Sequence, residues 1–129
     1  MASTAHRSAH TAPPGHSEGD VRVAIEGAVA TVTLARPHKR NALSLRVIDG
    51  LREAFDGLPD GVKAVVLHGD GEHFCAGLDL SELPSLTPAD GMMHSRAWYA
   101  AFERIQFGRR PVVCAMHGAG VGGGLELAA

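Results

Sequence analysis

The sequence predicts an α/β fold, in which strands and helices follow one another along a single domain. Three stretches support this prediction. Residues 21–34 alternate apolar and polar side chains on both sides of Gly27, which is the pattern of a β-hairpin. Residues 44–58 repeat apolar side chains at helical spacing. Residues 112–116 form a short apolar run, and a glycine-rich turn separates it from residues that are compatible with a helix.

The composition is that of a soluble globular protein. Of its 129 residues, 45% are apolar and 20% are charged, and the formal net charge is −2, so no basic surface for nucleic acid or membrane is expected. Eight histidines are scattered and two cysteines form no cluster, so we expect no metal site, and reduced thiols in a cytoplasmic protein. Residues 1–20 have almost no large apolar side chain, which predicts a disordered tail before a domain at 21–129.

The first half of the domain is expected to run from hairpin to helix to strand. The hairpin strands are residues 21–26 and 29–34. Ser44 is a plausible N-cap for a helix through Leu58, because its hydroxyl can accept a hydrogen bond from an amide of the first turn. Residues 62–68 are rich in β-branched side chains and predict a buried strand.

The second half is expected to contain a long helix. Residues 87–90, Thr-Pro-Ala-Asp, have the pattern of an N-cap, a first-position proline and a third-position acid. Gly108 is expected to end this helix near Phe107. We expect its core-facing side chains to include Trp98, Phe102, Ile105, Met92 and Met93.

The stretch from Gly118 to Glu126 is where we expect a ligand site. Its five glycines let a ligand approach the backbone, and the first N–H groups of the following helix favour developing negative charge. Glu126 lies about one turn inside that helix, within reach of a bound group. Two other interpretations stay open: a plain glycine-rich turn with a solvated glutamate, and the G-x-G-x-x-G fingerprint of a dinucleotide site.

Three smaller features have alternative interpretations. The loop from Arg36 to Arg40 holds three cations that are either solvated or bind a phosphate-bearing ligand. Asp79 either starts a short helix or serves as an active-site acid, and we favour the first. Cys75 can act as a nucleophile only beside an activating base, and the sequence indicates no partner histidine.

Three segments in register resemble motifs of the crotonase (enoyl-CoA hydratase/isomerase) family. Residues 74–80, Phe-Cys-Ala-Gly-Leu-Asp-Leu, resemble its F-x-A-G-x-D-[LI] element. Residues 117–128 resemble its N-G-x-x-x-G-G-G-x-E-L-A element, with His117 where the family often has asparagine. Residues 36–43 resemble the R-P-x-x-x-N-A-L segment before its first helix. The order and separation of the motifs agree across nearly all of residues 21–129.

The resemblance implies a crotonase-like spiral of ββα units, with residues 21–129 as an N-terminal part that is incomplete at its C-terminus. It implies an acyl-CoA substrate, no separate cofactor because coenzyme A belongs to the substrate, and a homo-oligomer that is a trimer or a dimer of trimers. It also implies an oxyanion hole formed by the backbone N–H groups of Leu78 and Gly123, with Glu126 as acid or base. The other substrate-binding residues that it implies are Lys39, Ala42, Ala76, Asp79, Leu80 and Gly122.

We therefore expect an enoyl-CoA hydratase, a lyase of fatty acid metabolism that adds water to trans-2-enoyl-CoA thioesters. Hydratases of this family use two glutamates, and the second lies after the region present here. Another acyl-CoA reaction of the family (isomerase, dehalogenase or hydrolase) is the alternative, and a nicotinamide-dependent oxidoreductase is a distant one. We expect the 129-residue chain alone to be inactive, because it stops inside the helix that carries Glu126.

Overall fold

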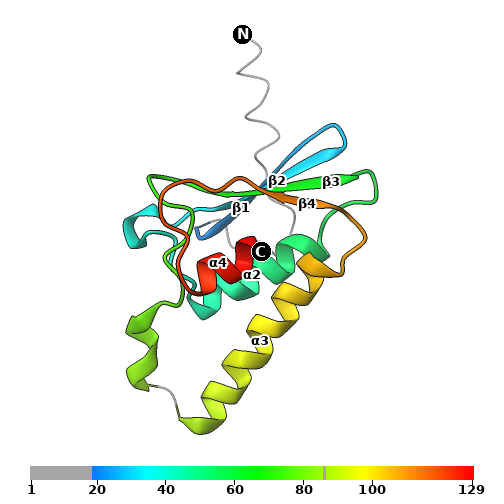
Figure 1. Ribbon diagram of the computed structural model, residues 1–129. Coiled ribbons are helices and arrows are strands. Elements are labelled where there is room, and N and C mark those ends of the chain that lie inside the picture. The colour runs from blue at the N-terminus through cyan, green and yellow to red at the C-terminus, as the bar shows by residue number, and fades with distance from the viewer. Residues whose placement is uncertain (1–18, 86) are drawn as a thin grey trace.

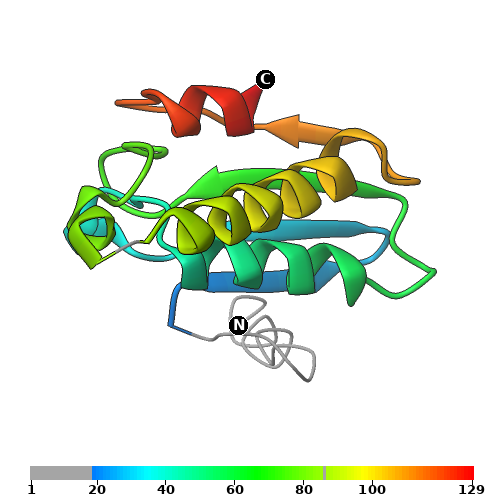
Figure 2. The same cartoon turned by 90° about the horizontal axis from the view of Figure 1, so that it is seen from below.

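One four-stranded sheet organises the protein, for which a computed structural model describes residues 19–85 and 87–129. The part of the predicted tail before Gly19 lies outside the described residues. The strands lie in the order β1 (Val21–Glu26), β2 (Val29–Leu34), β3 (Ala64–Gly69) and β4 (Val112–Cys114). β1 and β2 are antiparallel, whereas β2, β3 and β4 run parallel, as Figure 2 shows. The predicted hairpin and α/β class are confirmed.

Helix α2 (Leu45–Asp56) covers one face of this sheet, on β1 and β2 (Figure 1). Ser44 caps it as expected, because its Oγ accepts a hydrogen bond from Val47 N at 3.2 Å. The helix ends at Asp56 rather than Leu58, and Leu45, one of the apolar side chains at helical spacing, is 40% exposed rather than buried. The residues that it buries are Val47, Ile48, Gly50, Leu51 and Ala54.

The core lies between α2 and the sheet. Alternate residues of a strand face the same side, so β1, β2 and β3 each direct a row of apolar side chains toward the helix. Burying one such side chain fully contributes roughly 1.5–3 kcal/mol. The fully buried members from the strands are Val21, Ala30, Val32, Leu34, Val65 and Leu67. Phe74, which follows the sheet in a loop, is fully buried as well and is the largest of these side chains.

Helix α3 (Pro88–Gln106) packs on α2 and extends beyond the sheet at its N-terminal end (Figure 1). The predicted capping box is present: Thr87 Oγ1 accepts from Asp90 N, and Asp90 Oδ2 accepts from Thr87 N. Ala101 is buried, and Trp98, Phe102 and Ile105 pack partly buried against the core. The prediction for Met92 and Met93 is wrong, because they lie on the protruding end and are 60% and 63% exposed.

The remaining elements are short. One 3-10 helix, η2 (Pro37–Lys39), follows β2, and another, η3 (Leu80–Ser85), follows the loop after β3. Helix α4 (Gly123–Ala128) follows the glycine-rich turn. β3 begins at Ala64 rather than residue 62, and β4 ends at Cys114 rather than residue 116. Beyond that end, Ala115 N still donates to Leu67 O at 2.8 Å, so the chain stays alongside β3.

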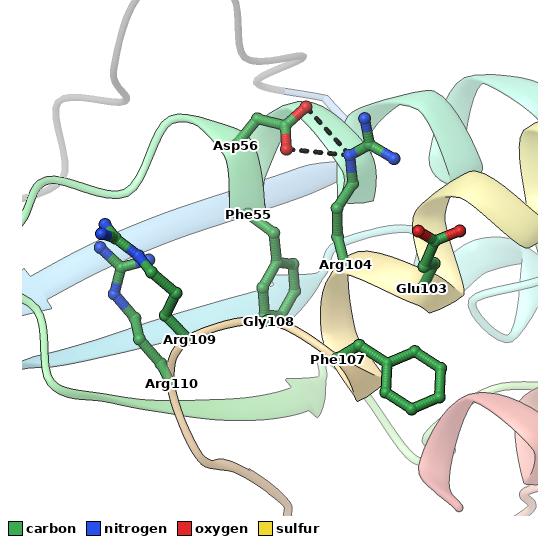
Figure 3. Close-up of a pocket in the computed structure, with 8 residues that line it drawn as sticks. All are labelled: Phe55, Asp56, Glu103, Arg104, Phe107, Gly108, Arg109 and Arg110. Carbon is green, nitrogen blue, oxygen red and sulfur yellow. Dashed lines mark hydrogen bonds and ion pairs between the residues drawn. The ribbon is translucent and has the colours of Figure 1, made fainter.

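The C-terminal ends of α2 and α3 enclose a hollow of about 360 Å³ (Figure 3). Arg104 reaches from α3 to both carboxylate oxygens of Asp56, at 2.9 and 3.1 Å. Arg110 donates from Nε to Val62 O at 2.8 Å and from Nη2 to Pro59 O at 2.9 Å and Leu58 O at 3.2 Å. These arginines tie the two helix ends to the loop before β3, so we assign the hollow a structural role.

Replacing Arg110 with methionine should lower the free energy of unfolding by roughly 1–3 kcal/mol, because three carbonyl groups lose a hydrogen bond. In the part of the chain that the structure describes, only Pro59 O keeps another, from Val62 N. Arg109→Met is the matched control. Its guanidinium pairs with Asp60 across two largely exposed side chains, so its loss should cost less than about 1 kcal/mol. Urea unfolding of both variants measures the difference, and equal midpoints would contradict a structural role for Arg110.

Candidate functional site

The segment from Phe74 to Asp79 lies between two other loops and is hydrogen-bonded to both. On one side, Cys75 N donates to Ala119 O and Val121 N donates to Cys75 O, each at 3.1 Å. On the other side, Ala76 N donates to Arg40 O at 3.0 Å. The three segments that carry the family motifs, far apart in sequence, are therefore joined side by side.

A reversal at Gly77 decides where the Leu78 amide points. Asp79 N donates to Leu43 O at 3.1 Å, so Ala76 N and Asp79 N both face the loop of residues 40–43. Amides three apart in a regular strand face opposite sides, so the alternation must reverse once between them. Gly77, with φ of +93°, is the residue that allows this. The N–H of Leu78 consequently points away from Leu43, toward the glycine-rich turn.

Gly123 lies beside that amide. A Cβ placed on Gly77 would be 3.3 Å from Gly123 N and 2.7 Å from Val121 O, so the two backbones touch there. Gly123 is the first residue of α4, and its N–H precedes the first hydrogen bond of the helix. Within residues 19–85 and 87–129, neither Leu78 N nor Gly123 N donates to a protein acceptor. The fold thus places two unengaged N–H groups on backbone segments that touch at Gly77.

An open pocket of about 440 Å³ adjoins these amides. All three predicted catalytic residues, Leu78, Gly123 and Glu126, line it together. Glu126 lies on α4, one turn after Gly123, and its side chain is exposed to the pocket. The rest of the lining comes from α3, namely His94, Ser95, Trp98, Tyr99 and Phe102. The sequence did not indicate that α3 would form this wall.

The other predicted substrate-binding residues lie around the pocket without lining it. Lys39 is exposed in η2, and Leu80 is 69% exposed at the start of η3. Ala42 and Ala76 are partly buried on neighbouring segments, and Gly122 is the exposed residue before α4. The last of these predicted residues, Asp79, is buried, and its carboxylate is hydrogen-bonded to Arg36 and Ser81. It is therefore not free to act on a substrate.

Asp79 anchors the start of η3. Its Oδ1 accepts from Ser81 Oγ at 2.6 Å and from Ser81 N at 3.0 Å, while Oδ2 accepts from Arg36 at 2.8 Å. The hydrogen bond from the Ser81 side chain and the one from Arg36 lower the pKa of Asp79 from 3.8 to about 2. The helix-start interpretation of Asp79 therefore fits the structure better than an active-site acid. Arg36 is likewise held inside the protein and is not a free cation of the basic loop.

A lowered pKa makes the contribution of Asp79 to stability depend on pH. The stabilisation is fully present above the unfolded-state pKa near 3.8 and is lost as the pH falls toward about 2. We expect the free energy of unfolding of the parent to fall more steeply across this window than that of Asp79→Asn. Urea titrations at several pH values measure the difference between the two curves, which isolates Asp79 from other carboxylates. Parallel curves would contradict the assignment.

Asn41 is a positioning residue that sequence reasoning missed. It is 1% exposed and has φ of +55°. Its side-chain amide donates to Asp70 O and His73 O at 2.9 Å each, and its Oδ1 accepts from Arg36 N at 2.8 Å. It therefore fastens the loop after β2 to the loop after β3. The available signal was its place in the R-P-x-x-x-N-A-L segment.

The thiol of Cys75 lacks the properties of a nucleophile. Cys75 is fully buried, and its Sγ donates to Asn41 O at 3.1 Å. Desolvation by burial raises its pKa, which disfavours the reactive thiolate. Among the described residues no three His, Cys, Asp or Glu side chains cluster as metal ligands would, and no helix there is apolar and long enough to cross a membrane.

Comparison with known proteins matches residues 24–129 to the family model described as enoyl-CoA hydratase/isomerase. The chain belongs to this family. It is 36% identical over 111 residues to a "Probable enoyl-CoA hydratase" of Bacillus subtilis (strain 168), covering 84% of this chain and 43% of that protein. This enoyl-CoA hydratase/isomerase family chain thus spans less than half the length of the curated relatives that it matches.

Solved structures agree with this assignment. A crystal structure from Rhodopseudomonas palustris CGA009 is 45% identical with a TM-score of 0.81, covering 87% of this chain and 43% of that one. A structure from Thermobifida fusca YX in complex with CoA is 29% identical with a TM-score of 0.77, covering 85% and 46%. The crotonase-like fold of a partial chain is therefore confirmed.

Other relatives in the same family carry other reaction names. A peroxisomal Delta(3,5)-Delta(2,4)-dienoyl-CoA isomerase of Arabidopsis thaliana is 33% identical, covering 83% of this chain and 44% of that protein. A 4-chlorobenzoyl coenzyme A dehalogenase-2 of Arthrobacter sp is 34% identical, covering 86% and 43%. Membership in the family therefore leaves the reaction to be argued from the site.

Proposed function

We propose that the complete protein containing this chain is an enoyl-CoA hydratase, which adds water to trans-2-enoyl-CoA thioesters. The observation that carries this proposal is the meeting of three groups in one pocket: the amides of Leu78 and Gly123 and the carboxylate of Glu126. The Bacillus subtilis relative with a hydratase name and the Thermobifida fusca structure in complex with CoA support the substrate class.

The Leu78 and Gly123 amides suit a thioester carbonyl that becomes an enolate. When the oxygen of water bonds to C3, the electrons of the C2–C3 double bond move to the carbonyl oxygen. Two preorganised N–H donors stabilise that charge, and each is worth about 10²–10³ in rate. Because the donors are backbone groups, the fold rather than the residue type at position 78 supplies them.

Glu126 suits the role of general base. Its carboxylate takes the proton that water loses as the C3–O bond forms, and C2 receives a proton from a second acid. In hydratases of the family that this chain resembles, the second acid is a glutamate. We further propose a homotrimer or dimer of trimers, as the resemblance implies, and a cytoplasmic location, as the expected reduced cysteines indicate.

The alternative is another acyl-CoA reaction, favoured by the isomerase and dehalogenase relatives. The two amides serve any reaction that builds charge on the thioester oxygen, so they do not discriminate. A hydration assay does: the complete protein should remove the conjugated absorbance of crotonyl-CoA and yield the 3-hydroxyacyl thioester. Turnover of a 3-enoyl or halogenated thioester without hydration would instead favour the alternative.

Lys39 is proposed to contact the phosphates of coenzyme A. It is exposed in η2, and the next residue, Arg40, accepts a hydrogen bond from Ala76 N, two residues before Leu78. Lys39→Glu should raise KM for acyl-CoA by at least about fivefold with little change in kcat, the pattern of lost uniform binding. Lys63→Glu, at an exposed lysine beside Asp60, is the control and should leave KM unchanged. An unaltered KM in Lys39→Glu would favour the other interpretation, in which the loop from Arg36 to Arg40 is a solvated surface.

A further inference from the structure

Three rings of α3 form a continuous wall of the pocket. His94, Trp98 and Phe102 follow one another at single-turn spacing, and all three line the cavity. The ring centroids of His94 and Trp98 lie 5.8 Å apart, and those of Trp98 and Phe102 lie 5.5 Å apart. The planes of His94 and Trp98 are inclined by 35° and those of Trp98 and Phe102 by 46°, so the wall is not flat, and a conjugated or aromatic group can stack on one ring at a time.

Trp98 fixes this wall relative to the unengaged amides. A Cβ on Gly123 would lie 2.5 and 2.7 Å from two carbons of the Trp98 six-membered ring, so the indole packs directly on Gly123. An acyl group whose carbonyl oxygen is held at Gly123 therefore begins at Trp98. From there the ring wall leads in one direction to His94 and in the other to Phe102.

The His94 end of the wall is polar. Glu82 of η3 accepts a hydrogen bond from Leu45 N, the first amide of α2, through Oε1 at 3.0 Å. This holds the same oxygen 3.9 Å from His94 Nε2. His94 keeps only 12% of its side chain exposed, and that remainder lines the pocket. A mostly buried imidazole with a carboxylate oxygen 3.9 Å from its Nε2 thus lies at one end of the aromatic wall.

Two ring nitrogens on this wall lack hydrogen-bond partners. Among the described residues, His94 Nε2 and Trp98 Nε1 are the buried side-chain atoms without one. An unpartnered buried polar atom is destabilising, and native proteins keep few of them. The indole N–H can only donate, whereas imidazole can donate or accept. A hydroxyl group, which both donates and accepts, is a ligand group that suits the imidazole nitrogen in either tautomer.

We propose that this pocket selects thioesters whose acyl group is flat and carries a hydroxyl that hydrogen-bonds to the His94 end of the wall. A hydroxyaryl acyl group fits both requirements: its ring stacks on Trp98, and its hydroxyl reaches the histidine that lies beside Glu82. This inference rests on the proposed function, because it takes the thioester carbonyl to lie at Gly123. Under it, His94 is a specificity-determining residue.

The test uses saturated thioesters, which cannot be hydrated, so that binding is measured apart from turnover. The complete protein is titrated calorimetrically with 3-phenylpropanoyl-CoA and with 3-(4-hydroxyphenyl)propanoyl-CoA. We expect the parent to bind the hydroxylated thioester at least about tenfold more tightly. His94→Phe keeps a ring on the wall and should abolish the preference, whereas His94→Gln keeps a polar group and should retain part of it. Arg96→Gln, at an exposed position of α3 that does not line the pocket, should leave the preference unchanged.

Equal affinities of the parent for the two thioesters would overturn the inference. A His94→Phe variant that retains the full preference, or loses affinity for both thioesters equally, would also overturn it. If His94→Phe does not fold, judged by its thermal melt, His94→Gln and the parent decide the question. Failure of the proposed function looks different: the hydroxyl preference would persist while no enoyl thioester is hydrated.

Discussion

Replacing Glu126 with glutamine should reduce the hydration of crotonyl-CoA by about 10²–10⁴-fold in kcat. This is the usual contribution of a positioned acid or base. Glutamine has nearly the same shape but cannot take a proton from water. The side chain is exposed to the pocket and lies on α4 after the buried Gly124, so the substitution should leave the fold intact. Steady-state kinetics of the complete protein measure the loss, with KM expected to change little.

Glu103→Gln is the control for this experiment. Glu103 is an exposed glutamate of α3 that lines the other hollow, at the far ends of α2 and α3 (Figure 3). The same chemical change there should leave kcat unaltered. If Glu126→Gln hydrates crotonyl-CoA as fast as the parent, Glu126 is not the base, and the hydratase assignment loses its main support.

The fold was largely predictable because its elements have local causes. The hairpin follows from alternation around Gly27, and the capped helices follow from the hydroxyls of Ser44 and Thr87. The errors lie where tertiary packing decides. Met92 and Met93 have apolar side chains at helical positions, but α3 extends beyond the sheet there, so nothing covers them among the described residues. Element ends also shifted by about two residues.

The site was predictable only in part. Leu78, Gly123 and Glu126 were expected from motifs, and the structure brings them together. The wall formed by α3 was not expected, because helical periodicity shows which residues share a face but not what that face contacts. Asn41 was missed for a similar reason: its partners at residues 70 and 73 are distant in sequence, and no local pattern reports such contacts.

Gly77→Ala should combine a large loss of activity with a loss of stability. A non-glycine residue at φ of +93° is strained by roughly 1–2 kcal/mol. The new methyl group would also lie 2.7 Å from Val121 O and 3.3 Å from Gly123 N, which forces backbone to move at roughly 1–3 kcal/mol more. We expect the unfolding free energy to fall by about 2–5 kcal/mol by these two effects together.

The activity loss follows from where that displacement occurs. Gly77 reverses the strand so that the Leu78 amide faces Gly123, and a shift of about 1 Å between two catalytic groups can cost about 10²-fold in rate. Gly27→Ala is the control that separates backbone strain from steric contact. Gly27 has φ of +61°, but an added Cβ there would have nothing within 4 Å. It should lose only about 1 kcal/mol of stability and no kcat. If Gly77→Ala and Gly27→Ala have the same kcat, the reversal at Gly77 does not position the N–H groups of Leu78 and Gly123.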